Sequence, residues 1–157
     1  MRQPDGKLIA AGTSGTVGAV VRFEPDGSLD AHFGKGGEVT TANTIGPSPS
    51  AFYEVLLRQP DGKLIAAGEM NPGEAADQDI ALVRYGTDGS LDRSFGHGGK
   101  TRIAAGPSLN NIHALVRQPD GKLVIAVSHI DESSDTSFSL LVRLSRNGRI
   151  DPGFGRK

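Results

Sequence analysis

The sequence predicts an all-β fold assembled from about three repeated units of antiparallel strands, and two motifs that recur in step carry this prediction. The hexapeptide Arg-Gln-Pro-Asp-Gly-Lys occurs three times, 56 and 59 residues apart, at positions 2–7, 58–63 and 117–122. The motif Leu/Ile-Asp-x-x-Phe-Gly also occurs three times, 62 and 59 residues apart, at positions 29–34, 91–96 and 150–155. Self-similarity at such a period is typical of repeat proteins.

The composition agrees with many short strands joined by tight turns. The 157 residues include 22 Gly and 9 Pro, and the apolar runs are short and interrupted by Gly, so we predict no helix. The absence of Cys excludes disulfides, thiolate metal sites and Cys nucleophiles. A net charge of −1 favours neither nucleic acid nor an anionic membrane as a partner. No apolar run approaches the roughly 20 residues of a membrane span.

The middle unit shows the order of its elements most completely. At Pro60-Asp61-Gly62, Pro presets φ, Asp bonds its own backbone and Gly accepts a positive φ, so the flanking runs form a hairpin. A second turn follows the third strand, and its three copies are Pro25-Asp26-Gly27-Ser28, Thr87-Asp88-Gly89-Ser90 and Arg146-Asn147-Gly148-Arg149. The four predicted strands of this unit lie at residues 52–58, 63–67, 80–85 and 100–104.

Four antiparallel strands per unit, joined by short links, are typical of the blades of a β-propeller. Aligning the units puts Met1 level with Leu57 and Val116, so the first unit lacks its opening strand, and the third lacks its closing strand. We expect about ten strands in one repeat segment, with units at roughly 1–51, 52–111 and 112–157. Because closed propellers have typically 4–8 blades, we expect a fragment of a longer repeat protein. The rival interpretation is strand exchange between two copies, which gives six blades.

Three stretches of the middle unit carry a resemblance to a known family. They read Gln-Pro-Asp-Gly-Lys-Leu-Ile-Ala-Ala-Gly, then Leu-Val-Arg-Tyr, then Asp-Gly-Ser-Leu-Asp-Arg-Ser-Phe-Gly-x-Gly-Gly-Lys. Together they resemble the Delta-60 repeat family, and the resemblance covers nearly the whole chain. It implies a β-propeller-like fold in a large bacterial protein that is secreted or held at the cell surface. It implies no catalytic or ligand-binding residue.

Charged residues recur at fixed places in the units. Arg precedes Asp by eight residues in each unit, and across a turn such a pair forms a charge-assisted contact that locks the hairpin. We therefore assign a structural role to the pairs Arg22 and Asp30, Arg84 and Asp92, and Arg143 and Asp151. We also expect the Phe of the second motif to fill the gap between neighbouring blades, at Phe33, Phe95 and Phe154.

The residues that could support catalysis or metal binding do not form recognised patterns. None of the four His recurs at an equivalent position, and no two have the spacing of a metal site. The glycine-rich stretch around His97 lacks the Gly-Lys-Ser/Thr ending of a phosphate loop, and Ser94 and Ser139 lack the context of a nucleophile elbow. We therefore predict no catalytic residue, no metal and no cofactor.

The segments that differ between units point to an interaction face. In a meander of strands, both kinds of turn lie at one end of the sheets, and the remaining connections lie at the other end. These remaining connections vary in length and carry acidic residues, which suits a basic partner or a hard cation, although solvated loops are the simpler interpretation. The candidate residues of this face are Asp77, Asp79, His129, Asp131, Glu132 and Asp135.

These observations together favour a non-catalytic scaffold or protein-interaction module whose partner is an unknown protein or a glycan. Open edge strands also favour self-association. One alternative is a propeller enzyme, a lactonase-like or lyase-like hydrolase, which needs His and carboxylate ligands converging on a central channel. The other is a carbohydrate-binding lectin-like propeller, which needs an exposed aromatic residue in every unit.

Overall fold

The chain folds into three antiparallel sheets that follow one another along the sequence. The computed structural model describes residues 1–42, 51–70, 79–104, 109–131 and 136–155, and in these residues it contains strands and turns without a helix. The first sheet has the order β1-β2-β3, the second β4-β5-β6-β7 and the third β10-β9-β8. This confirms the all-β prediction and its count of strands. The strands are β1 (Leu8–Ser14), β2 (Val17–Phe23), β3 (Glu38–Thr41), β4 (Ala51–Arg58), β5 (Leu64–Met70), β6 (Asp79–Tyr85), β7 (Lys100–Ile103), β8 (Leu109–Arg117), β9 (Leu123–Asp131) and β10 (Thr136–Leu144).

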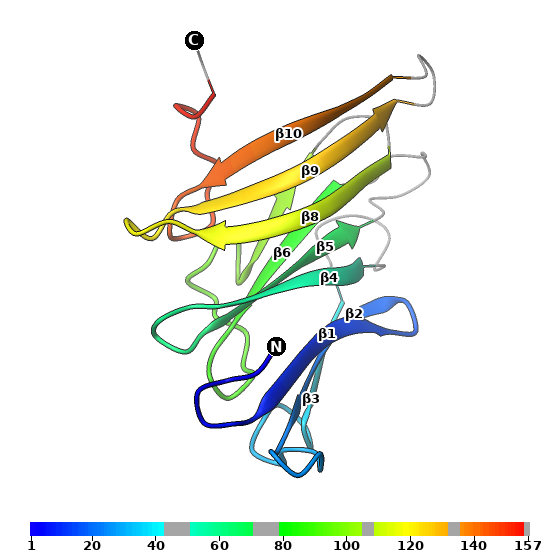
Figure 1. Cartoon of the computed structure of the whole chain (residues 1–157), viewed down its shortest axis with the longest axis vertical. Helices are drawn as coiled ribbons and strands as arrows, with labels where there is room; N and C mark the ends of the chain where they lie inside the picture. The colour runs from blue at the N-terminus through cyan, green and yellow to red at the C-terminus, as the bar shows by residue number, and fades with distance from the viewer. Residues whose placement is uncertain (43–50, 71–78, 105–108, 132–135, 156–157) are drawn as a thin grey trace.

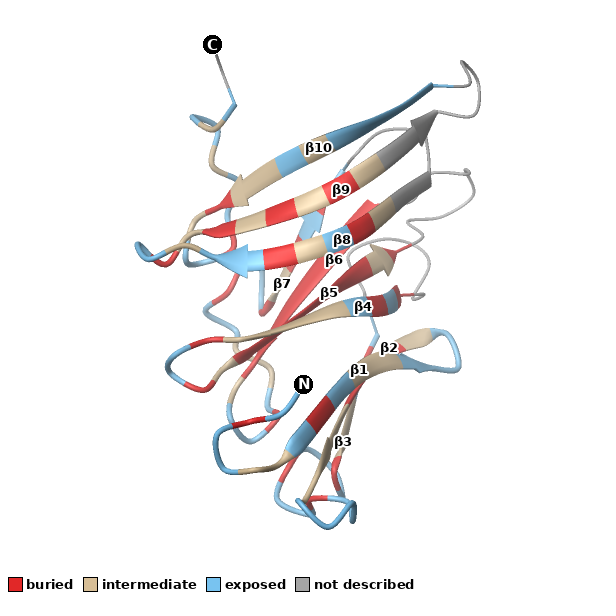
Figure 2. Cartoon of the chain, viewed as in Figure 1, coloured by how far each residue is buried: buried red, intermediate tan, exposed pale blue. Residues whose placement is uncertain are grey.

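The sheets are stacked, and the middle one lies between the other two (Figure 1). Two apolar cores fill the spaces between them, one centred on Ile9, Phe33 and Tyr85 and the other on Leu82, Phe95 and Ile125. Every residue of β6 is buried, because its Ile-Ala-Leu-Val run has a neighbouring sheet on each side, whereas β10 is mostly exposed or half-buried (Figure 2).

The Pro-Asp-Gly turns form as the sequence predicts. In the middle unit the N–H of Gly62 donates to the carbonyl of Gln59 at 2.9 Å, and φ of Gly62 is 85°. Oδ1 of Asp61 accepts a hydrogen bond from the N–H of Lys63. A Cβ added at Gly62 would touch Thr87 of the second turn, so both kinds of turn lie at the same end of the sheets.

The register of the first sheet agrees with the predicted alignment of the units. The N–H of Ile9 donates to the carbonyl of Met1 at 2.9 Å, just as Leu57 pairs with Ile65 in the second sheet. Met1 therefore occupies the position of a first-strand residue. The first and third sheets have three described strands each, and the second has four.

The strands differ from the predicted ranges mainly at their ends. β5 continues to Met70, three residues past the predicted end, because Gly68 permits a close approach of the backbone of Phe52 that a Cβ would block. Two bulges that were not predicted interrupt the strand pairing, one at Glu54 between β4 and β5 and one at His113 between β8 and β9.

Two leucines at equivalent positions differ in burial, and this difference predicts unequal effects on stability. Leu82 is 0% exposed between the second and third sheets, whereas Leu141, at the same position of the third unit, is 61% exposed. We expect Leu82→Ala to lower the free energy of unfolding by about 3 kcal/mol. We expect Leu141→Ala to lower it by about 0.5 kcal/mol or less. Urea unfolding of dilute protein measures both, and equal losses would contradict the stacking order.

Candidate functional site

Each unit contains a carboxylate that binds two cationic side chains. In the middle unit, Oδ2 of Asp92 accepts hydrogen bonds from Nζ of Lys63 and from Nε of Arg84, both at 2.8 Å. The lysine follows the first turn and the arginine lies one residue before the end of the third strand, so one carboxylate fixes the first hairpin and the second turn together. The other units repeat this triad at 2.6–3.0 Å, with Lys7, Arg22 and Asp30 in the first and Lys122, Arg143 and Asp151 in the third. The predicted Arg–Asp contact is confirmed, and the lysine is an addition.

The cations lower the pKa of each carboxyl group. The hydrogen bond from Lys7 is the main cause at Asp30. Burial alone would raise the pKa of Asp92, but hydrogen bonds from Lys63 and Ser94 outweigh it. The hydrogen bond from Lys122 lowers the pKa of Asp151 to about 2. All three carboxylates are therefore ionised at neutral pH and make charge-assisted hydrogen bonds.

The arginine of each triad also covers an aromatic ring. The guanidinium carbon of Arg84 lies 4.7 Å from the centroid of Phe95, and the other two units have distances of 4.5 and 4.4 Å. Phe33 and Phe95 are fully buried between neighbouring units, as predicted, and Phe154 is half-buried. Each arginine thus joins an ion pair to a cation–π contact.

The second turn of one unit inserts into a socket on the preceding unit. The socket consists of the triad arginine, the phenylalanine that this arginine covers, and the glycine that follows the phenylalanine. Nη1 of Arg84 donates to the carbonyl of Arg146 at 2.9 Å, and the N–H of Gly96 donates to the carbonyl of Asn147 at 2.7 Å. One unit earlier the same contacts join Arg22 to Thr87 and Gly34 to Asp88. This junction was not predicted from the sequence, although the turn glycine and the Phe-Gly pair recur together.

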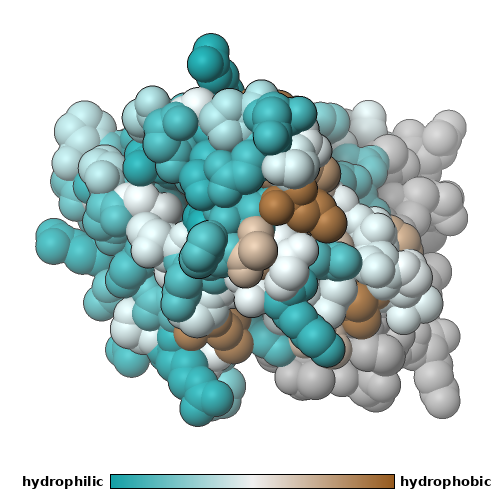
Figure 3. All heavy atoms as spheres, turned by 90° about the horizontal axis from the view of Figure 1, so that it is seen from below, coloured by the Kyte–Doolittle hydropathy of each residue, from teal (hydrophilic) through white to brown (hydrophobic). Residues whose placement is uncertain are grey.

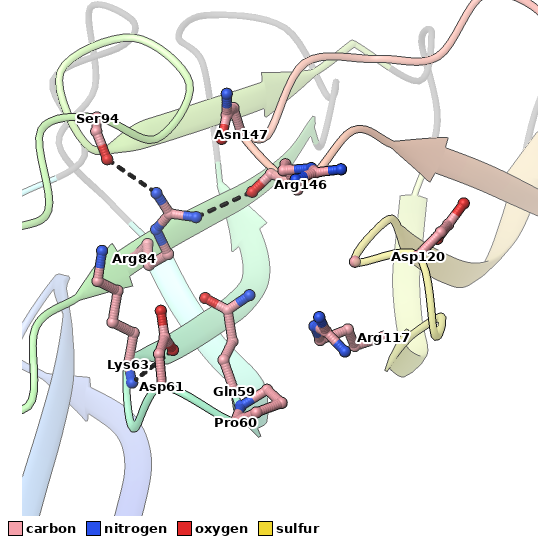
Figure 4. A pocket seen from close by; sticks show the side chains of 11 residues that line it. Gln59, Pro60, Asp61, Lys63, Arg84, Ser94, Arg117, Asp120, Arg146 and Asn147 are labelled. Carbon is pink, nitrogen blue, oxygen red and sulfur yellow. Dashed lines mark hydrogen bonds between the residues drawn. The ribbon is translucent and has the colours of Figure 1, made fainter.

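A polar cavity of about 380 Å³ lies beside the junction of the second and third units (Figure 4). Its Ser94 hydroxyl donates to Asp92 and accepts from Arg84, so it is held in place by the triad. Oε1 of Gln59 is buried and has no hydrogen-bond partner among the described residues, and the same is true of Gln3 in the first unit. The buried, unpaired glutamine oxygen therefore recurs in the first two units. Its lining is Gln59, Pro60, Asp61, Lys63, Arg84, Ser94, Arg117, Asp120, Gly121, Arg146 and Asn147.

The predicted acidic face is only partly covered by the described residues. Asp79 begins β6, where its side chain is buried and pairs with Arg102 of β7, so this carboxylate serves the sheet. His129 and Asp131 lie at the end of β9. The acidic face as a whole stays a prediction, since Asp77, Glu132 and Asp135 lie outside the described residues.

One pair of described carboxylates adds negative charge at the end of the sheets opposite the turns. Glu54 is the bulge residue of β4, and Glu69 lies near the end of β5. Burial, and then the charge of Glu54, raise the pKa of Glu69. No group of three or more His, Asp or Glu that could hold a metal occurs among the described residues.

A comparison with protein families identifies the repeats. Residues 3–33, 59–95 and 118–154 match the family described as "Domain of unknown function (DUF5122) beta-propeller", which is more than half of the chain. The chain belongs to the DUF5122 β-propeller family. Each matched segment of this family begins at the Gln of the first turn and ends at or near the socket phenylalanine, so it contains one complete triad.

The other comparisons add no relatives to the DUF5122 match. Neither the curated proteins nor the solved structures include a significant match to this chain. The family match supports β-propeller-like repeats, while the Delta-60 name rests on the resemblance of motifs alone. Across the described residues, no helix has the length and apolar character that a membrane crossing requires.

The triads predict how the stability of this DUF5122 chain depends on pH. Since the folded carboxyl groups have lowered pKa values, their contribution is complete above the unfolded pKa of about 3.9 and is lost as pH falls through the folded values. We expect the free energy of unfolding to fall between about pH 4 and pH 2. Urea unfolding at a series of pH values measures this dependence.

The variant Asp92→Asn is the control for this dependence. At pH 7 we expect it to be less stable than the parent by about 3 kcal/mol, because two cations lose the negative charge that pairs with them. The difference should shrink as the pH falls below about 4, because the unfolded parent then gains a proton at Asp92 that the folded parent resists. A difference that stays constant with pH would contradict the assignment.

The insertion of the turns predicts different effects of alanine at two glycines that share the same backbone conformation. Gly148 and Gly27 have φ of 78° and 88°, so alanine strains both by about 1–2 kcal/mol. A Cβ at Gly148 would lie 2.7 Å from the ring of Phe95, whereas a Cβ at Gly27 has nothing within 4 Å. We expect Gly148→Ala to cost about 1–3 kcal/mol more than Gly27→Ala in urea unfolding of dilute protein. Equal costs would argue against insertion.

Proposed function

We propose that this chain is a non-catalytic repeat scaffold that serves as a protein-interaction module. The observation that carries the proposal is that the recurrent polar residues bind one another. In every unit the lysine, the aspartate and the arginine satisfy one another, and in the first two units the arginine also holds the next turn. Residues that a repeat could offer for chemistry are thus engaged in folding.

The recurrent aromatic residues support a scaffold over a lectin-like function. A sugar-binding propeller would present one exposed ring in each unit for stacking. Phe33 and Phe95 are instead fully buried under an arginine and the next turn. The rings therefore support the packing of the units.

We place the interaction surface at the end of the sheets opposite the turns. The turn end repeats the turn hydrogen bonds and the triad in every unit, and this framework holds the sheets in a fixed arrangement. The opposite end carries the connections that differ in length, 16 residues from Gly6 to Arg22 but 22 from Gly62 to Arg84. Variable connections on a rigid scaffold are where recognition usually occurs. A setting in a larger exported bacterial protein rests on the Delta-60 resemblance.

A charge-matched pair of variants tests this surface. The probe is a lysine-rich peptide, whose binding to the parent is measured by calorimetry at low and physiological salt. We expect the triple variant Asp131→Asn, Glu132→Gln, Asp135→Asn to bind about tenfold more weakly, which is about 1.4 kcal/mol. The control Asp5→Asn, Asp61→Asn, Asp120→Asn removes the same charge from the turn end and should bind like the parent.

Each outcome of this experiment has a distinct meaning. Equal weakening by both triple variants would show a response to net charge alone and would end the proposal of a specific face. An absence of binding by the parent would also reject a basic partner at this surface. A calcium titration of the parent tests a cation as the ligand, and a titration without heat rejects that version.

A further inference from the structure

Each interface between units has two different halves. The earlier unit contributes its socket and an apolar surface, which we call the forward face. The later unit contributes its second turn and another apolar surface, which we call the backward face. The chain contains this interface twice, with Val20 and Leu82 at equivalent places of the forward faces and Leu64 and Leu123 at equivalent places of the backward faces.

The forward face of the third unit is assembled but exposed. Leu141 is 61% exposed, whereas the equivalent Val20 and Leu82 are 0% exposed. Val116 of the same face is 52% exposed. The socket is already formed, because Arg143 pairs with Asp151 at 3.0 Å and its guanidinium carbon lies 4.4 Å from the centroid of Phe154.

The backward face of the first unit is exposed in the same way. Leu8 is 43% exposed, although the equivalent Leu64 and Leu123 are 0% exposed. Seen from the end where the first unit lies, small hydrophobic patches are set among hydrophilic atoms (Figure 3). One chain therefore carries both halves of an interface that it already makes twice.

The second turn of the first unit has the shape of the turns that insert into sockets. Oδ1 of Asp26 accepts from the N–H of Ser28 at 2.9 Å, as Asp88 does from Ser90. φ of Gly27 is 88°, against 85° for Gly89. A Cβ at Gly89 would collide with the preceding unit, whereas a Cβ at Gly27 has nothing within 4 Å.

We propose that the forward face of the third unit binds the backward face of the first unit of a second copy of this chain. By analogy with the two internal junctions, Arg143 donates to the carbonyl of Pro25, the N–H of Gly155 donates to the carbonyl of Asp26, and the ring of Phe154 covers Gly27. The contact is head-to-tail, because its two halves differ. Two copies supply six units, which falls within the range of typically 4–8 for closed propellers.

This contact is weaker than the internal junctions for a structural reason. The internal sockets also use the outer strand, where Thr101 donates to the carbonyl of Gly148 at 2.8 Å and Val39 lies beside Gly89. Among the described residues, the third unit has no outer strand, and the first unit has no inner strand equivalent to β4 and β8. Association should therefore depend on protein concentration.

The first experiment measures molar mass by light scattering over a range of concentrations reaching about 100 µM, well above the micromolar dissociation constants of weak interfaces. The protomer is 16.4 kDa, and we expect the parent to reach twice this mass or more. Leu141→Glu and Leu8→Glu each place a charge on an exposed residue of one face. Each should weaken association at least tenfold while circular dichroism shows an unchanged fold.

The control His97→Glu places a charge on an exposed loop of the central unit, away from both end faces, and should keep the mass of the parent. A parent that stays at the protomer mass at every concentration would overturn the proposal. So would association of Leu8→Glu or Leu141→Glu at the strength of the parent, which is the outcome expected if open strand edges pair instead.

The second experiment mixes the two variants. Leu8→Glu keeps an intact forward face, and Leu141→Glu keeps an intact backward face, so an equimolar mixture should form a one-to-one complex although each variant alone stays a protomer. A symmetric interface between identical patches cannot be restored in this way. A mixture that remains at the protomer mass therefore overturns the head-to-tail contact. The result is independent of whether a basic peptide binds the opposite surface.

Discussion

The aspartate of the second motif is the centre on which the rest of the structure depends. In the middle unit the carboxylate of Asp92 holds Lys63 from the first hairpin and Arg84 from the third strand, and its other oxygen accepts hydrogen bonds from Ser94. The arginine that it orients then binds the next turn. One acceptor thereby connects the folding of a unit to the joining of units. A neutral residue at this position would remove both connections at once.

The sequence was sufficient for the elements whose partners are close along the chain. The strands follow from turn residues such as Pro60 and Gly62, and the contact of Arg84 with Asp92 follows from a spacing of eight residues across one turn. Lys63 was missed because its reach to Asp92 spans 29 residues and depends on how two hairpins lie together. The bulge at His113 has no sequence signature, since the residues around it read as an ordinary strand.

In the candidate site too, features that are local in the sequence could be predicted, whereas contacts between distant residues could not. The variable connections are visible in the sequence as differences in length, so their place at one end of the sheets could be derived. The sequence could not show which of their charges remain available to a partner. Asp79 reads as one more loop carboxylate, yet it begins β6 and pairs with Arg102 of β7, a partner that only the folded sheet brings near. Membership of the DUF5122 family indicates a β-propeller architecture, but only the structure shows which carboxylates pair within a sheet.

The recurrence of one junction gives the chain a direction. Every unit carries a socket on one side and a turn on the other, so its two faces are complementary rather than alike. Stability in such a protein is a sum of terms within units and between nearest neighbours. The middle unit has both neighbours and buries every residue of β6, whereas Leu8 and Leu141 mark two faces that each lack one neighbour. Because these two faces differ in the same way as the halves of the internal junctions, the physical complement of either face is the other one.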